Sequence, residues 1–245
     1  MSRWRVTLEY DGSGFVGWQR QDNGLSVQQV LEEAVAGFAQ ERVTLFAAGR
    51  TDSGVHALGQ VAHFDLQKKT DALTVRDALN FHCKPHPVAV LAAETVPDDF
   101  HARFSATRRH YLFRILNRRA PPVLDAGRVW HVPAPLDAAA MHAAAQLLVG
   151  QHDFSSFRAA ECQAESPVKT LDALTVSRMA EEIHVTAAAR SFLHNQIRIL
   201  AGTLRLVGEG KWPTGRVHDA LEARDRSAAG PTAPPAGLYL AKVDY

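Results

Sequence analysis

One carboxylate stands out as a candidate for chemistry, because Asp52 lies in the crowded segment Gly49-Arg50-Thr51-Asp52-Ser53-Gly54-Val55-His56. The pKa of an unperturbed aspartate is about 3.9, so an ionised side chain is expected at neutral pH. Arg50, two residues away, is a candidate ion-pair partner. Arg198 is a second, because a cation within the apolar run Ile197 to Leu204 needs a partner when it is buried. A structural ion pair and a catalytic carboxylate both fit these residue types.

The residues on either side of Asp52 predict that it lies in an ordered loop between two strands. An apolar run from Val43 to Ala48 precedes it, and a second strand-like run from Val61 to Leu66 follows. Loops held by a rigid scaffold carry binding and catalytic residues more often than the core does. The segment is therefore the first place to look for function.

The elements of the first hundred residues predict a β-α-β-β-α-β unit of the ferredoxin-like or RRM-like kind. Ser26 is a typical helix cap, and apolar residues recur along one helical face behind it. Besides the two strands that flank Asp52, the expected elements are a strand from Trp4 to Tyr10, a helix from Ser26 to about Gln40, a helix from Val75 to His82 and a strand from Ala89 to Glu94.

The second half of the chain echoes this order of elements without a visible sequence repeat. The segment from Gly150 to Lys169 is polar and irregular, which is typical of a long functional loop. The expected elements are a strand from Arg108 to Asn117, a helix capped by Asp137 and running to about Val149, strands at Leu174–Arg178 and Glu182–Ala189, helices at Phe192–Val207 and Arg216–Ala223, and a last strand from Leu238 to Val243. The prediction is an α+β protein with mixed, mainly antiparallel sheets and two halves, 1–100 and 101–245, around a central cleft.

Length and composition indicate an ordinary globular chain. It has 245 residues, of which 46% are hydrophobic, enough for a buried core in one or two domains. No apolar stretch approaches the roughly 20 residues of a membrane helix, and the first residues run directly into a strand, so we expect a cytoplasmic protein without membrane contact. Cys83 and Cys162 lie far apart and are expected to be free thiols.

The distribution of positive charge says more than the net charge of +1. Of the 27 basic residues 21 are arginines, and the window from His101 to Arg119 contains six of them and no acidic residue. Arginine suits phosphate groups and base edges better than lysine does, so the stripe fits contact with RNA. A solvated strand face explains it equally well.

Three other kinds of site fit the sequence less well. Gly12-Ser13-Gly14-Phe15-Val16-Gly17 has the spacing of a dinucleotide-binding loop, but the turn-rich residues that follow cannot open the helix that a pyrophosphate needs. His82-Cys83-x-x-His86 lacks a fourth metal ligand at a suitable spacing, so no metal is expected. Asp52, Ser53 and His56 are too close in sequence for a hydrolase triad, which the fold assembles from distant residues.

Six motifs in one order along nearly the whole chain resemble the TruA-type tRNA pseudouridine synthases. The segment around Asp52 is the most specific of them, whereas the glycine loop or the final motif alone would be weak. The motifs are Tyr10-Asp11-Gly12-Ser13-Gly14-Phe15-Val16-Gly17-Trp18-Gln19, Gly49-Arg50-Thr51-Asp52-Ser53-Gly54-Val55-His56-Ala57, His101-Ala102-Arg103-Phe104-Ser105-Ala106-Thr107, Gly150-Gln151-His152-Asp153-Phe154, Phe192-Leu193-His194-Asn195-Gln196-Ile197-Arg198 and Gly237-Leu238-Tyr239-Leu240.

The resemblance implies isomerisation of uridine to pseudouridine at positions 38, 39 and 40 of the tRNA anticodon arm, without a redox cofactor or a metal. Asp52 matches the essential aspartate of the family, which acts as the nucleophile or promotes glycosidic cleavage. Tyr111 matches the tyrosine that stacks on the target base, Arg198 the helix arginine paired with the aspartate, and Arg50 the arginine beside the flipped nucleotide. Gln196 departs from the pattern, which has methionine there.

The resemblance also implies a homodimer whose tRNA contacts both subunits. The chief alternative is a non-catalytic RRM-like RNA-binding protein, in which Arg50, Asp52 and Arg198 only brace the fold. In either case, Arg103, Arg108 and Arg109 are candidates for guiding the phosphate backbone.

Overall fold

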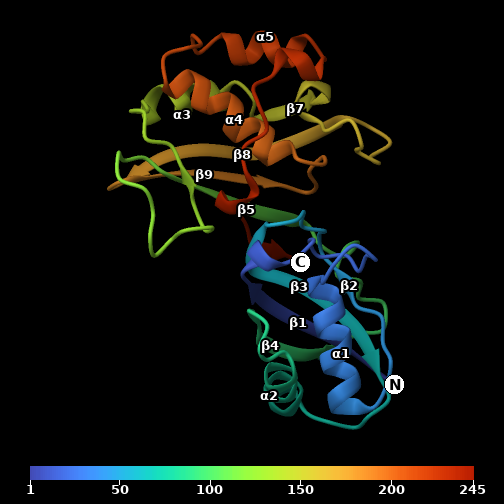
Figure 1. The fold of residues 1–245 in the computed structure, drawn as a ribbon. Coiled ribbons are helices and arrows are strands. Elements are labelled where there is room, and N and C mark those ends of the chain that lie inside the picture. The colour runs from blue at the N-terminus through green and yellow to red at the C-terminus, as the bar shows by residue number, and fades with distance from the viewer. The chain divides into compact units, whose positions relative to one another are not determined.

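The computed structural model describes residues 1–245, which form two compact units. The first unit comprises Met1–Thr107 together with Tyr239–Tyr245, and the second comprises Arg108–Leu238. Each unit combines helices with a sheet whose strand pairs are mostly antiparallel (Figure 1). The predicted α+β class with mixed, mainly antiparallel sheets is therefore confirmed.

The first unit has the predicted β-α-β-β-α-β order, followed by a strand from the end of the chain. Its strands are ordered β4-β1-β3-β10, with the short β2 paired to β3, and only the β3–β10 pair is parallel. Helices α1 and α2 pack against each other beside this sheet (Figure 1). The elements are β1 (Ser2–Tyr10), α1 (Val27–Ala39), β2 (Phe46–Ala47), β3 (His56–Leu66), α2 (Ala72–His82), β4 (Val88–Val96) and β10 (Leu238–Asp244).

Local sequence patterns account for these elements. Trp4, Val6 and Leu8 alternate along β1 with more exposed residues and are at most 2% exposed, so they form the core face of the sheet. The hydroxyl of Ser26 accepts a hydrogen bond from the backbone N–H of Gln29, which caps α1 as predicted. The core thus lies between the sheet and the two helices.

The second unit contains an antiparallel sheet in the order β5-β9-β8-β7, with β6 parallel to β5. Helices α3 and α4 pack on it and on each other, and α5 contacts α3 and β7 (Figure 1). None of the helices in either unit has the length and apolar composition needed to span a bilayer. The elements are β5 (Arg108–Leu116), β6 (Trp130–His131), α3 (Ala138–Gln146), β7 (Gly150–Asp153), β8 (Val168–Met179), β9 (Glu182–Ala189), α4 (Gln196–Gly208) and α5 (Arg216–Glu222).

Several predicted boundaries are wrong. Part of the expected loop from Gly150 to Lys169 is the strand β7, which pairs with β8 from Gly150↔Leu171 to Asp153↔Val168. The strand is short and lies at the edge of the sheet, where pairing with β8 does not require apolar alternation. Helix α4 begins at Gln196 and not at Phe192, since Asn195 has a left-handed backbone conformation (φ 60°).

The division into units also differs from the predicted halves, 1–100 and 101–245. From Tyr239 on, the last strand, β10, belongs to the first unit, because Tyr239 and Leu240 pair in parallel with His56 and Ala57 of β3. Gly59 permits this close approach: a Cβ there would lie 2.6 Å from the carbonyl oxygen of Ala241. This pairing joins residues far apart in sequence, and no local pattern indicates it.

Candidate active site

Asp52 lies in the connection between β2 and β3, as predicted, although β2 is shorter than expected and β3 begins five residues earlier, at His56. Backbone hydrogen bonds shape the connection at both ends. Ala48 N–H donates to the carbonyl of Val61 (2.8 Å), and Val55 N–H donates to the carbonyl of Asp52 itself (3.1 Å). Gly54 supplies the positive φ of 75° that this tight turn needs. The Asp52 side chain is half-buried.

The glycine loop after β1 packs directly against the Asp52 loop. Trp18 N–H donates to the carbonyl of Thr51 (2.9 Å), and the Ser53 hydroxyl donates to the carbonyl of Phe15 (3.1 Å). Both glycines at the contact are required: a Cβ on Gly12 would lie 1.9 Å from the carbonyl oxygen of Val55, and Gly17 has φ +114°. The glycines therefore allow backbone to approach backbone, and they open no phosphate-binding helix.

A layer of buried polar side chains also supports the Asp52 loop. The hydroxyl of Tyr10 lies 2.7 Å from that of Thr51, and Gln60 Nε2 donates to the carbonyl of Gly49 (2.7 Å) and to the Tyr10 hydroxyl (3.4 Å). Burial raises the pKa of Tyr10 to about 12, so its hydroxyl stays protonated. Tyr10 begins one of the sequence motifs, but neither it nor Gln60 was predicted to have a role at the site. The amide of Gln60, within the largely apolar strand β3, was the one sequence feature that could have indicated a buried polar contact.

His56 is held by structural contacts. Its Nδ1 accepts a hydrogen bond from Gly12 N–H (3.0 Å) and lies 3.3 Å from a carboxylate oxygen of Asp11, while its ring stacks on Tyr239 (4.7 Å between centroids). The side chain is almost fully buried. His56 thus ties the glycine loop and β10 to the start of β3, which agrees with excluding a triad with Ser53.

The predicted pairing of Arg50 with Asp52 is wrong. The Arg50 side chain is exposed and makes no hydrogen bond or ion pair within the chain. It remains able to contact a substrate next to the Asp52 loop.

Tyr111 and Arg198 lie in the second unit, where the structure brings both to the beginning of α4. Tyr111 is on β5, and its ring meets that of Phe192 edge to face, with centroids 5.1 Å apart. Arg198, in the first turn of α4, donates through Nε to the carbonyl of Ala233 (2.8 Å) and through Nη1 to the Asn195 side chain (2.7 Å). These contacts fix the guanidinium, which is half-buried.

The departure at Gln196 has a structural explanation. The side chain is 1% exposed, and its Oε1 accepts a hydrogen bond from Leu193 N–H (2.8 Å). The amide therefore binds the backbone just before α4, and a methionine sulfur would be only a weak acceptor there.

The basic stripe on β5 is largely a network of ion pairs. Arg108 pairs with Asp172 (3.0 Å) and Arg114 with Glu182 (2.6 Å). Arg109 is 8% exposed and donates to the carbonyl of Arg190, so the prediction that it guides phosphates is wrong. The other two arginines proposed for that role, Arg103 and Arg108, are both exposed, and the guanidinium of Arg103 lies over the ring of Phe104.

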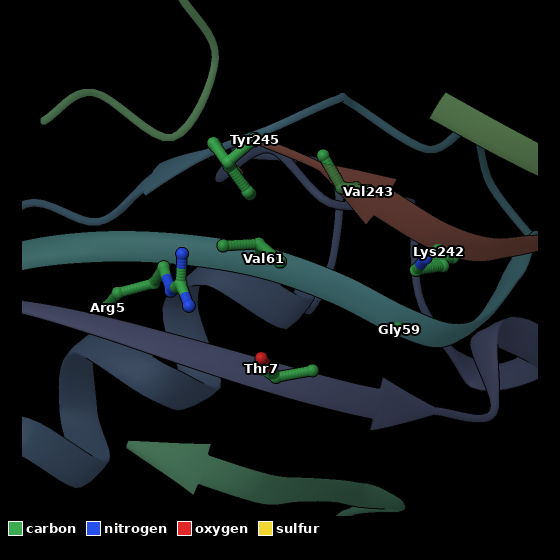
Figure 2. Close-up of a pocket in the computed structure, with 7 residues that line it drawn as sticks. All are labelled: Arg5, Thr7, Gly59, Val61, Lys242, Val243 and Tyr245. Atoms are coloured by element: carbon green, nitrogen blue, oxygen red, sulfur yellow. The ribbon is translucent and has the colours of Figure 1, made fainter. Parts of the chain in front are cut away.

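A hollow of about 220 Å³ in the first unit is separate from this chemistry. It lies on the sheet face opposite α1 and α2, because the β1 residues that line it alternate with the buried core residues of the strand. The lining residues, shown in Figure 2, are Arg5, Thr7, Gly59, Val61, Lys242, Val243 and Tyr245.

No group of three or more His, Cys, Asp or Glu side chains is arranged to hold a metal ion. Cys83, in the segment from His82 to His86, is buried, and burial raises the pKa of its thiol to about 11.

Comparison with known proteins agrees with the motif around Asp52. A family model described as tRNA pseudouridine synthase matches residues 7–105 and 144–245. Proteins named tRNA pseudouridine synthase A are similar over all 245 residues: one from Rhodospirillum centenum is 66% identical and one from Parvibaculum lavamentivorans 60%, each covered over its full length. One from Rhodospirillum rubrum is 62% identical, with 88% of its length covered. The chain belongs to the tRNA pseudouridine synthase family.

Proposed function

We propose that Asp52 is the catalytic carboxylate with which this enzyme isomerises uridine to pseudouridine at positions 38, 39 and 40 of tRNA. The observation that carries the proposal is the anchoring of the Asp52 loop. Backbone bonds from Trp18 and side-chain bonds from Tyr10 and Gln60 hold the residues around Asp52. Such support from a second layer of residues is what a reacting group needs to keep its geometry.

The reaction itself needs no electron acceptor. The N1–C1′ glycosidic bond breaks, the uracil turns over, C5 bonds to C1′, the proton leaves C5, and N1 gains one. Asp52 either attacks C1′ or promotes the elimination that cleaves the glycosidic bond. The base must be out of its stack for a side chain to reach C1′. Throughout the rotation it must also be held in place.

We propose that three residues hold the flipped nucleotide in place. Tyr111 stacks on the detached base, and its edge-to-face contact with Phe192 supports the ring orientation. Arg198 pairs with Asp52, and its bonds to Ala233 and Asn195 keep the guanidinium in one place. The exposed Arg50 fills or contacts the space beside the flipped nucleotide.

Release of tritium from tRNA that carries 5-tritiated uridine in the anticodon arm tests the catalytic assignment. Asp52→Asn is expected to abolish release while tRNA binding changes little. Asp22→Asn is the matched control, because Asp22 is an exposed carboxylate of the same unit with no ion pair. Full turnover by Asp52→Asn would refute the assignment, and binding without turnover by the unmodified chain would favour an RNA-binding module.

Membership of the family also suggests how the protein assembles and where in the cell it works. We propose that the chain works as a homodimer in the cytoplasm, where its tRNA substrate is made and used. Light scattering coupled to size-exclusion chromatography should give a mass near twice 26.8 kDa, and a monomer with full activity would contradict the dimer. Pseudouridine maps of tRNA from cells with and without the gene should differ at positions 38 to 40.

A further inference from the structure

We propose that Tyr10 and Gln60 are positioning residues for Asp52, acting through Thr51 and Gly49. The inference rests on the proposed catalytic role of Asp52. Neither residue lies in the loop that it supports: Tyr10 ends β1, and Gln60 is in β3. They contact the residue just before Asp52 and the one three positions before it.

The side chains that make these contacts are buried. Tyr10 is 4% exposed, Gln60 0% and Thr51 6%, while the bond from Gln60 to Gly49 is half-buried. Loss of the bond between Tyr10 and Thr51 would therefore leave an unpaired polar group inside the unit. Hydroxyl and amide groups at such depth hold their partners in one arrangement.

The donor and the acceptor of each hydrogen bond in this group can be assigned. Gln60 donates through Nε2 to Gly49 and Tyr10, and its Oε1 accepts from Val61 N–H (3.2 Å). The Tyr10 oxygen therefore accepts from Gln60, which leaves its proton for the hydroxyl oxygen of Thr51. Burial raises the pKa of Tyr10, so this proton is retained at neutral pH. A phenylalanine could fill the same space, but it could not complete the chain of bonds.

Thr51 is consequently held from two sides. Its hydroxyl meets Tyr10 (2.7 Å), and its carbonyl accepts from Trp18 N–H (2.9 Å). That carbonyl belongs to the peptide group that links Thr51 to Asp52. Fixing the peptide limits where the Asp52 carboxylate can point. Reaction at C1′ is sensitive to small displacements, and a misplacement of about 1 Å can cost roughly a hundredfold in rate.

The experiment measures kcat and KM by tritium release for Tyr10→Phe, Gln60→Met and Thr51→Val. Each is expected to lower kcat roughly tenfold, with KM for tRNA within about twofold, because geometry and not binding is lost. Tyr10→Phe combined with Thr51→Val should be no slower than the slower single variant, since both remove the same bond. Thr51→Ser keeps the hydroxyl and should retain most of the activity.

Asn80→Ala is the matched control for stability. Asn80 in α2 also makes two half-buried bonds within the first unit, to the N–H and carbonyl of Val90. The Asn80→Ala substitution should lower Tm, while kcat stays near the kcat of the unmodified protein. Unchanged kcat in Tyr10→Phe and Thr51→Val, or equal losses in Thr51→Ser and Thr51→Val, would overturn the proposal. Failure of the proposed function would differ, because Asp52→Asn would then remain active.

Discussion

His63 makes the stability of the first unit depend on pH. Its ring, in the middle of β3, is 3% exposed, and its Nδ1 accepts a hydrogen bond from Ala102 N–H (3.1 Å). Burial lowers the pKa of His63 to about 4, and the neighbouring His101 and Arg3 act in the same direction, against Asp65. Protonation would remove the acceptor for Ala102 and place a cation among these groups.

The sign of the effect follows from the direction of the shift. The unfolded chain takes up a proton at His63 as the pH falls through about 6.5, whereas the folded chain does so only near 4. Between these values the unfolded state binds more protons, so acid favours unfolding. The slope is about 1.4 kcal/mol per pH unit for one proton, and roughly 3 kcal/mol is lost over the whole window.

Urea denaturation at pH 7.5, 6.5, 5.5 and 4.5 measures this slope. His63→Gln should flatten the dependence between pH 6.5 and 5.5, where most carboxylates remain ionised. His218→Gln, at an exposed histidine of α5, should leave it unchanged. An identical pH dependence in the unmodified chain and in His63→Gln would refute the reasoning, because His63 would then titrate alike in both states.

Three further predictions concern single side chains. Gly12→Ala should lower both Tm and kcat, because its Cβ would lie 1.9 Å from the Val55 carbonyl and push the Asp52 loop aside; overpacking costs about 1–3 kcal/mol, and an unshifted Tm would contradict it. Arg50→Gln should reduce kcat/KM for tRNA with Tm unchanged, since the side chain has no partner in the chain; a large loss of Tm would show a structural role. Thr203→Val should destabilise the second unit by about 1–3 kcal/mol in urea, because its buried hydroxyl bonds two main-chain groups; a neutral effect would mean that these bonds contribute little.

Much of the local structure could be predicted from the sequence. Ser26 and Asp137 cap the helices that they were expected to cap, and β1 alternates as its residues indicate. These features depend on residues within one turn or one strand. The Asp52 motif was likewise recognisable, because the loop needs particular residue types at consecutive positions.

Other predictions failed where distant segments decide the outcome. Arg109 belongs to a basic stripe in the sequence, yet its side chain is buried and bonds the carbonyl of Arg190, 81 positions away. The pairing of Arg50 with Asp52 looked favourable from their spacing, but the two side chains do not pair. Spacing gives the reach of a side chain and not its direction.

The sequence by itself determined the type of chemistry, since the residues around Asp52 and the order of the motifs specify the family. Only the tertiary structure decided what supports that carboxylate. Tyr10 and Gln60 reach the Asp52 loop because β1 and β3 pair in register, with Leu8 opposite Gln60 and Tyr10 opposite Ala57. Such pairing depends on backbone hydrogen bonds and burial between segments about fifty residues apart, and no local pattern records which distant residue will lie beneath a loop.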